Sequence, residues 1–187
     1  SAWGDEDQYP EAIQQLLKGQ EGKNLNIYIN SGGGDVFAGM AIYNIIKRHT
    51  GFKTVYVDGL AASIASVIAM AGENLVIPKN AFLMIHIPWS FVIGNANDML
   101  KEIELLNAIE QSIVNIYAEH LADNVDTETI AKMVDAETWL TGEQAAEYFS
   151  VDVAAEKQIA ACTNARFKNQ PKNLVVVTTE REKNHSA

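Results

Sequence analysis

The chain has 187 residues, a formal net charge of -10, and hydrophobic and charged fractions of 48% and 20%. This composition is that of an ordinary globular protein, long enough to bury one sizeable core. The acidic balance argues against nucleic acid as a main partner, because phosphate binding needs clustered Lys and Arg. No apolar segment reaches the roughly 20 residues of a membrane helix, and the polar N-terminus has no signal-peptide character. We therefore expect a protein without membrane contact that is either cytoplasmic or has had a targeting segment removed.

Cysteine and histidine usage narrow the chemistry further. Cys162 is the only cysteine, so the chain has no intrachain disulfide framework, which fits a reducing compartment. The four histidines are scattered, and no cysteine or carboxylate joins them at metal-ligand spacing. We expect neither a metal site nor a cofactor.

Helical and strand-like segments alternate along the chain, which predicts an α/β fold. Helices are expected at residues 11–18, 36–47, 61–71, 95–122, 127–134 and 141–148. Strands are expected at residues 25–30, 53–57, 74–77, 81–85 and 174–178, with a strand or turn at 151–153. Residues 135–140 are expected to form a short connection. The helix at 95–122 has an apolar stripe wide enough for a partner subunit as well as the core, and the pattern does not separate these two uses.

The turn after the expected strand 53–57 is the first candidate for chemistry. Residues 58–66 read DGLAASIAS, so a strand stops at a glycine and small residues open an apolar helix. Ser63 would then face the helix N-terminus, where N–H groups lack intrahelical partners and the field favours negative charge. A serine there can act as a nucleophile if a base and an acid reach it. The same pattern is also typical of a helix cap or a tight helix contact.

The second candidate is the glycine run at residues 31–35, SGGGD, between an expected strand and an expected helix. It is not a phosphate loop, because Met40 and Ala41 stand where such a loop has Lys and Ser or Thr. The glycine run is either a flexible turn or a segment whose backbone N–H groups are exposed, because glycine has no side chain to cover them. In the second case its N–H groups could hold an oxyanion or pair with an extended peptide.

His86 is the best candidate for a base. It ends the expected strand 81–85, at the edge where the other turns emerge, and is followed by Ile87 and Pro88. A histidine at a strand end is also often a half-buried packing residue. The other three histidines are poorer candidates. His49 ends an expected helix, His120 lies among polar neighbours and His185 falls in the C-terminal tail.

Together these stretches resemble the Clp protease proteolytic-subunit family, in particular the branch that tailed phages and prophages carry as a capsid-maturation (prohead) protease. The resembling segments appear in the family's order between residues 10 and 155. They are INSGGGD, AG and AIY within 29–43, GLAAS at 59–63, MIHIP at 84–88, and ETWLT, EY and VD within 137–152. Asp35 and the Glu-Thr-Trp segment at 137–139 resemble the phage branch rather than the housekeeping bacterial subunit.

The resemblance implies a serine endopeptidase, with Ser63 as the nucleophile and His86 as the general base. It places the oxyanion at the backbone N–H groups of Gly34 and Ile64. It also places Gly32 and Gly33 along a bound peptide substrate.

The third member of the triad departs from the family pattern. The family usually has an Asp a few residues before an aromatic-Leu-Ser/Thr segment, and an ungapped match puts Glu137 there. Asp135, two residues earlier, stays the alternative. Gly32 stands where the housekeeping subunit has proline. Residues 1–9 match only a remnant of the family's first strand, which leaves the presence of that strand open.

The implied fold is the α/β spiral of ββα units shared with crotonases, with the helix at 95–122 as a projecting handle between subunits. Residues 1–160 would form the peptidase domain and residues 161–187 a polar C-terminal extension. Family members form homo-oligomeric rings, commonly stacked, with the active sites inside.

The implied activity is cleavage of phage scaffold and capsid proteins in the bacterial host cytoplasm or the prohead. The chain has no ATPase motif, so any unfolding motor would be a separate protein. The activity is expected to be independent of ATP, because a phage enzyme of this kind meets scaffold and capsid proteins inside the immature head. Two alternatives stay open. One is a non-catalytic assembly subunit of the same fold; the other, a crotonase-type acyl-CoA enzyme, is disfavoured because that family does not use a Ser–His pair.

Overall fold

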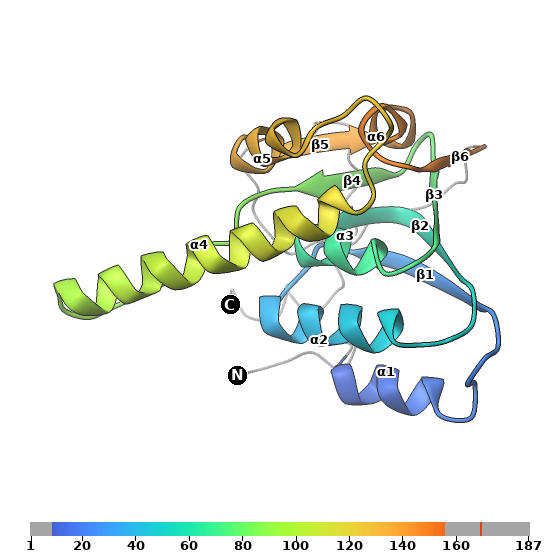
Figure 1. The fold of residues 1–187 in the computed structure, drawn as a ribbon, viewed down its shortest axis with the longest axis horizontal. Coiled ribbons are helices and arrows are strands. Elements are labelled where there is room, and N and C mark those ends of the chain that lie inside the picture. The colour runs from blue at the N-terminus through green and yellow to red at the C-terminus, as the bar shows by residue number, and fades with distance from the viewer. Residues whose placement is uncertain (1–8, 156–168, 170–187) are drawn as a thin grey trace, which may run out of the picture.

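The computed structural model describes residues 9–155 and residue 169 of the chain, and its alternating helices and strands confirm the α/β class (Figure 1). The helices are α1 (Pro10–Leu17), α2 (Val36–Lys47), α3 (Ile64–Ala69), α4 (Ala96–Ala118), α5 (Thr127–Asp135) and α6 (Gly142–Tyr148). The strands are β1 (Leu25–Ser31), β2 (Lys53–Ala62), β3 (Asn74–Pro78), β4 (Phe82–Ile85), β5 (Thr138–Thr141) and β6 (Asp152–Ala154).

The strands form one six-stranded sheet in the order β5-β4-β2-β3-β6, with β1 paired to β2. All pairs are parallel except β4 with β5. The long strand β2 is central. On one side it pairs with β1, and on the other its first half pairs with β3 and its last residues, Leu60 to Ala62, pair with β4. The C-terminal ends of β2 and β4 therefore lie side by side.

One cluster of buried side chains joins the sheet to the helices around it. Strands β1 to β4 contribute residues such as Val55, Val57 and Leu83, while α2, α3 and the second half of α4 contribute residues such as Ile42 and Val67. Figure 1 shows α1, α2 and α3 stacked next to β1 and β2, with α5, β5 and α6 at the opposite end. The short helix α3 is almost wholly buried, which fixes the turn in front of it.

Three predicted boundaries are wrong, and in each case pairing between distant segments overrides the local pattern. Strand β2 continues through Gly59 to Ala62, and α3 begins only at Ile64, because β4 pairs with residues 60–62. Residues 138–141, expected in a connection, form β5 because β4 offers an antiparallel partner. Helix α4 ends at Ala118 because the following residues turn toward α6, where Leu121 forms a bridge with Phe149.

Two other predictions, the strand at 174–178 and the separate extension at 161–187, lie outside the described residues apart from residue 169. The first strand of the resembling family cannot be compared either, because residues 1–8 are also outside them.

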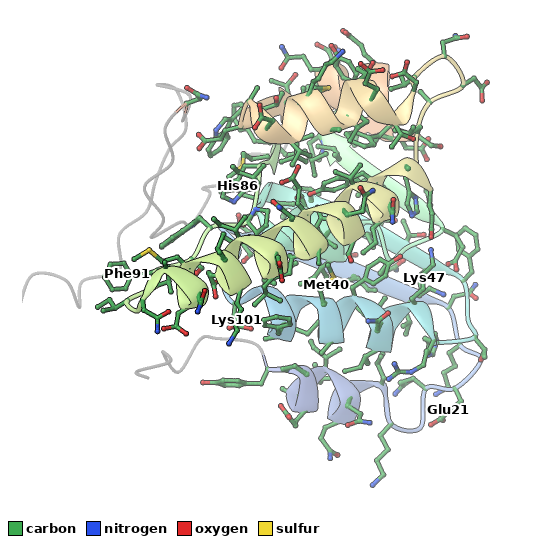
Figure 2. The ribbon with its side chains drawn as sticks, turned by 60° about the vertical axis from the view of Figure 1, so that its left-hand side comes forward. Glu21, Met40, Lys47, His86, Phe91 and Lys101 are labelled. Atoms are coloured by element: carbon green, nitrogen blue, oxygen red, sulfur yellow. The ribbon has the colours of Figure 1, made fainter. Side chains whose placement is uncertain are left out.

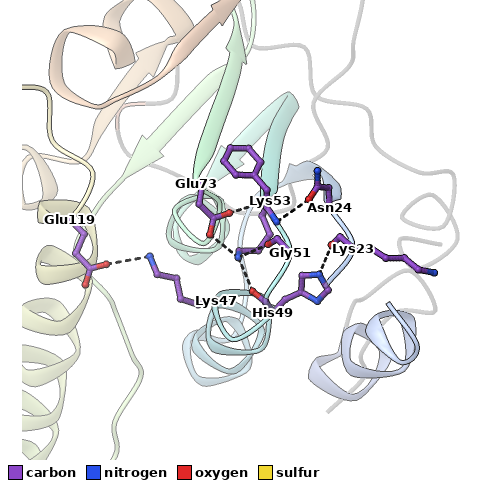
Figure 3. A network of polar contacts seen from close by, with 9 residues as sticks. Lys23, Asn24, Lys47, His49, Gly51, Lys53, Glu73 and Glu119 are labelled. Atoms are coloured by element: carbon purple, nitrogen blue, oxygen red, sulfur yellow. Dashed lines mark hydrogen bonds and ion pairs between the residues drawn. The ribbon is translucent and has the colours of Figure 1, made fainter. Parts of the chain in front are cut away.

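A polar network holds the start of β2 (Figure 3). The side chain of Lys53 is only 3% exposed, and its Nζ contacts Glu73 Oε1 at 2.8 Å. The same ammonium donates to the carbonyl oxygens of His49 at 2.9 Å and Gly51 at 3.1 Å. The backbone N–H of Lys53 donates to Glu73 Oε2 at 2.6 Å, so one carboxylate binds both ends of this residue. The network joins the turn before β2 to the loop after α3.

We expect Glu73→Gln to lower the free energy of unfolding by about 1–3 kcal/mol at neutral pH, because a buried ammonium loses its counter-charge. Partial burial raises the pKa of Glu73, but the hydrogen bonds and charge of Lys53 outweigh it, so the pKa lies below its usual value. The stabilisation is present above the unfolded-state pKa of about 4.3 and is lost as the pH falls through the lower folded-state pKa.

Urea unfolding at pH 7 and at pH 3 measures this difference. Glu128→Gln is the matched control, because its ion pair with Lys132 is about three quarters exposed on both sides and is expected to contribute at most about 1 kcal/mol. Equal effects of the two substitutions at pH 7 would contradict the assigned role of Glu73.

The first half of α4 projects away from the core (Figure 1). In the loop before it, Trp89, Phe91 and Ile93 are 78%, 82% and 84% exposed, and Leu100 and Ile103 on the helix are 57% and 53% exposed. Figure 2 shows Phe91 at this projecting end, well apart from Lys47 at the far end of α2. Neighbouring exposed apolar side chains of this kind mark interaction surfaces. Within the described residues, no helix has the length and apolarity to cross a membrane.

Candidate active site

Ser63 occupies a constrained turn between β2 and α3. Its backbone has φ 56° and ψ -131°, a left-handed conformation that costs a residue with a side chain on the order of 1–3 kcal/mol. Packing and hydrogen bonds hold it there: the N–H of Ser63 donates to Met84 O at 3.0 Å, and its carbonyl accepts the Ser66 N–H at 3.0 Å. Ser63 occupies the N-cap position of α3, but its side chain makes no capping hydrogen bond.

His86 follows the end of β4, next to this turn. Its Nε2 lies 2.8 Å from Ser63 Oγ. The pairing of Ala62 with Met84 explains this proximity, because both chains leave the sheet at the same level. Burial lowers the pKa of His86 below its usual value, whereas the carboxylate of Glu137 acts in the opposite direction. The ring is therefore neutral at pH 7, the form that accepts a proton from a hydroxyl when the Nδ1 atom carries the ring hydrogen.

Glu137 immediately precedes β5. Ile85 pairs with Thr138 at the last position of the antiparallel ladder, so His86 and Glu137 each lie one residue beyond that pair. The negative charge of Glu137 favours the protonated His86 ring and so raises the pKa of His86, against the larger effect of burial. The backbone of Glu137 is also in the left-handed region, with φ 52°. The alternative acid, Asp135, is the exposed last residue of α5.

Further contacts fix the Glu137 carboxylate. Its Oε1 accepts the indole N–H of Trp139 at 3.4 Å and the backbone N–H of Asn169 at 2.6 Å. The side-chain amide of Asn169 donates to the carbonyls of Ala136 at 3.0 Å and Glu137 at 3.3 Å. The sequence carries no signal for the contribution of Asn169, which is 32 residues away and lies in a polar stretch without a motif.

The glycine run lies against the Ser63 turn, and Gly33 makes the closest approach. Gly33 has φ 94°, and a Cβ atom there would lie 2.8 Å from Ser63 Cβ, 2.8 Å from Ala62 O and 3.3 Å from Ile64 N. Its N–H donates to Ser31 Oγ at 3.2 Å. Gly34 follows with φ 157° and is exposed. The predicted neighbourhood of the glycine run and the serine turn is thus present, although the predicted roles of Gly32, Gly33, Gly34 and Ile64 stay predictions.

We expect Gly33→Ala to reduce the reactivity of Ser63 by at least tenfold, because the added methyl must displace the nucleophile or the glycine run, and misplacement by about 1 Å can cost 10²-fold. The rate of covalent modification by a fluorophosphonate measures the effect. Gly19→Ala is the matched control: Gly19 has φ 78°, but no atom lies within 4 Å of its added Cβ. Loss of reactivity in both variants would point to backbone strain rather than to contact with Ser63.

Sequence reasoning also missed two polar groups behind Ser63. Ser66, wholly buried on α3, contacts Ser63 O and the hydroxyl of Tyr117 on α4. Tyr117 lies on the helix expected at 95–122, and the apolar stripe of that helix gives no sign of a buried polar contact. No group of three or more His, Cys, Asp or Glu side chains suited to a metal ion occurs in the described ranges, 9–155 and 169.

A serine in a strained strand-to-helix turn, with a histidine on its hydroxyl, is the arrangement of hydrolases that use a nucleophile and a base. The Clp protease family model matches residues 4–158. The chain therefore belongs to the Clp protease family.

Three curated relatives illustrate the match. The chain is 34% identical over 145 residues to "ATP-dependent Clp protease proteolytic subunit 1" of Streptomyces avermitilis, covering 75% of this chain and 65% of that protein. It is 33% identical to proteolytic subunit 2 of Corynebacterium diphtheriae, covering 76% and 71%. It is 31% identical to the proteolytic subunit of Bacteroides fragilis, covering 70% and 63%. The chain thus spans less than two thirds of the length of the first and third of these proteins.

Proposed function

We propose that the protein is a serine endopeptidase that uses Ser63 as nucleophile, His86 as general base and Glu137 as the acid that orients His86. The contact of 2.8 Å between Ser63 Oγ and His86 Nε2 carries this proposal. Membership of the Clp protease family supports the reaction class. The effect of Glu137 on the pKa of His86 favours it over Asp135 as the acid.

In the proposed reaction, Ser63 Oγ attacks a peptide carbonyl while His86 Nε2 takes the hydroxyl proton. The Glu137 carboxylate stabilises the resulting imidazolium. The N–H groups of Gly34 and Ile64 bind the oxyanion, and Gly32 and Gly33 line an extended peptide. The proton on His86 then goes to the leaving amine, and water hydrolyses the acyl-enzyme by the same route.

For the substrate, we propose phage scaffold and capsid proteins, with cleavage that needs no nucleotide. This finer assignment rests on the likeness of Asp35 and of residues 137–139 to the phage branch, whereas the named relatives are described as ATP-dependent.

We also propose assembly into a ring of identical subunits. The exposed Trp89, Phe91 and Ile93 before α4 offer an apolar surface for a second copy.

The decisive experiment treats the full chain with a fluorophosphonate at neutral pH, without nucleotide, and locates the adduct by mass spectrometry of peptides. A single adduct on the peptide that contains Ser63 is expected, and heat-unfolded protein is expected to give none. Absence of an adduct in the folded, assembled protein would overturn the proposal and favour a non-catalytic assembly subunit. Saturable binding of an acyl-CoA thioester in its place would favour a crotonase-type enzyme.

A further inference from the structure

The peptide unit between Ser63 and Ile64 is central to the proposed chemistry, because one residue supplies the nucleophile and the other an oxyanion donor. Two bonds hold its carbonyl oxygen. Ser63 O accepts the backbone N–H of Ser66 at 3.0 Å and the hydroxyl of Ser66 at 2.5 Å. On the other side of the same residue, the Ser63 N–H donates to Met84 O. The nucleophile's backbone is therefore bound at both of its polar groups.

The hydroxyl of Ser66 is in turn bound by Tyr117. The two oxygen atoms lie 2.7 Å apart, 51 residues apart in sequence. Ser66 has a single hydroxyl proton, and a carbonyl can only accept, so this proton is donated to Ser63 O. Ser66 Oγ must then accept from Tyr117. The bonds form a chain with one direction, from the Tyr117 O–H through the Ser66 hydroxyl to the Ser63 carbonyl.

Burial and long-range contact distinguish this chain of hydrogen bonds from an ordinary contact within one helix. A serine often donates to a carbonyl three or four residues back in a helix, so the bond from Ser66 to Ser63 alone would be unremarkable. Tyr117, however, comes from α4, and Ser66 and Tyr117 are 0% and 1% exposed, which shields their contact from bulk water. Burial raises the pKa of Tyr117, although its bond to Ser66 acts the other way, so the phenol keeps its proton near neutral pH.

We propose that Ser66 and Tyr117 are positioning residues that hold the Ser63–Ile64 peptide in the orientation needed for catalysis. In a trans peptide the C=O and N–H groups point in opposite directions. With the Ser63 carbonyl held inward by Ser66, the Ile64 N–H points out of the N-terminus of α3, the side from which an oxyanion would bind. The assigned benefit to oxyanion binding rests on the proposed function, whereas the hydrogen-bond chain does not.

Tyr117→Phe tests the inference, because it removes one hydroxyl and keeps the ring. The rate of fluorophosphonate modification of Ser63 is expected to fall about tenfold. The midpoint of its acid limb should not move, since His86 is untouched. Ser66→Ala is expected to lower the rate at least as much, and the double variant no further than Ser66→Ala, because the groups act as one chain. Tyr43→Phe, a buried tyrosine on α2, is the matched control and should stay within twofold.

Hydrogen exchange provides a readout that does not depend on activity. The Ser66 amide, which bonds the same Ser63 carbonyl, is expected to exchange faster in Tyr117→Phe than in Tyr43→Phe. Normal modification rates and normal Ser66 exchange in folded Tyr117→Phe would overturn the inference. So would independent, multiplicative effects of Tyr117→Phe and Ser66→Ala. Failure of the unmodified protein to react would instead overturn the proposed function. The hydrogen-exchange result would still decide whether the hydrogen bonds from Tyr117 and Ser66 hold the Ser63–Ile64 peptide.

Discussion

Replacing Ser63 with alanine is expected to abolish covalent labelling by a fluorophosphonate and to lower peptide hydrolysis on the order of 10⁶-fold, since the attacking oxygen is gone. His86→Ala is expected to cost about as much, because the hydroxyl 2.8 Å away then has no base. Alanine removes only the hydroxyl of Ser63, and the backbone hydrogen bonds of this residue to Met84 and Ser66 remain. The thermal midpoint should therefore change little.

Controls of the same residue types separate chemistry from general damage. Ser112→Ala removes an exposed hydroxyl on α4, and His49→Ala removes an imidazole that contacts Lys23 O, remote from the Ser63 turn. Both are expected to label at the unmodified rate. An adduct that persists in Ser63→Ala would identify another nucleophile, and full labelling of His86→Ala would show that Ser63 reacts without this base.

The pH dependence of labelling follows from the environment of His86. Burial lowers its pKa, so the neutral, proton-accepting ring persists below the usual midpoint near 6.5. Labelling should therefore rise with pH through a midpoint below 6.5 and be close to its plateau at pH 7.

The site residues that could be predicted lie where a strand ends or a helix begins. Ser63 follows a strand and precedes a helix, and His86 ends a strand before Pro88, so single residues could be placed from local pattern. Their contact could not be derived in this way. It depends on the pairing of Ala62 with Met84, which joins segments separated by more than 20 residues.

The errors have the same origin. Residues 60–62 are Leu-Ala-Ala, which locally favours a helix, so only the presence of β4 decides for a strand. Residues 138–141 form β5 for a similar reason, and this ladder brings Glu137 and His86 to one residue beyond the Ile85–Thr138 pair. Tyr117 lies on the helix with the predicted apolar stripe, but the partner of its hydroxyl lies on another helix, and periodicity carries no information about that contact.

Glu137→Gln is expected to lower the plateau rate of hydrolysis on the order of 10⁴-fold, because a neutral amide neither stabilises the imidazolium nor holds the required tautomer. The substitution removes the negative charge of the side chain and keeps its size. A glutamine Oε1 can still accept the N–H groups of Trp139 and Asn169, which bond Glu137 Oε1 in the native protein. Loss of the fold is therefore not expected, and near-ultraviolet circular dichroism checks this.

The same substitution should move the acid limb of the pH profile in a definite direction. The negative charge of Glu137 favours the protonated ring and so raises the pKa of His86, against the larger effect of burial. Removing the charge lowers this pKa, and the midpoint of the limb should shift to lower pH as the plateau falls. Glu137→Asp keeps the charge and is expected to retain more of the rate than Glu137→Gln, with a smaller shift.

Asp135→Asn is the control that separates the two candidate acids. Asp135 is exposed at the end of α5, so its loss should leave both the plateau and the acid limb unchanged. A collapse of activity in Asp135→Asn, with normal activity in Glu137→Gln, would transfer the role to Asp135. Equal and full activity of both variants would mean that the Ser63–His86 pair works without a carboxylate, as a dyad whose imidazole is held by packing at the end of β4.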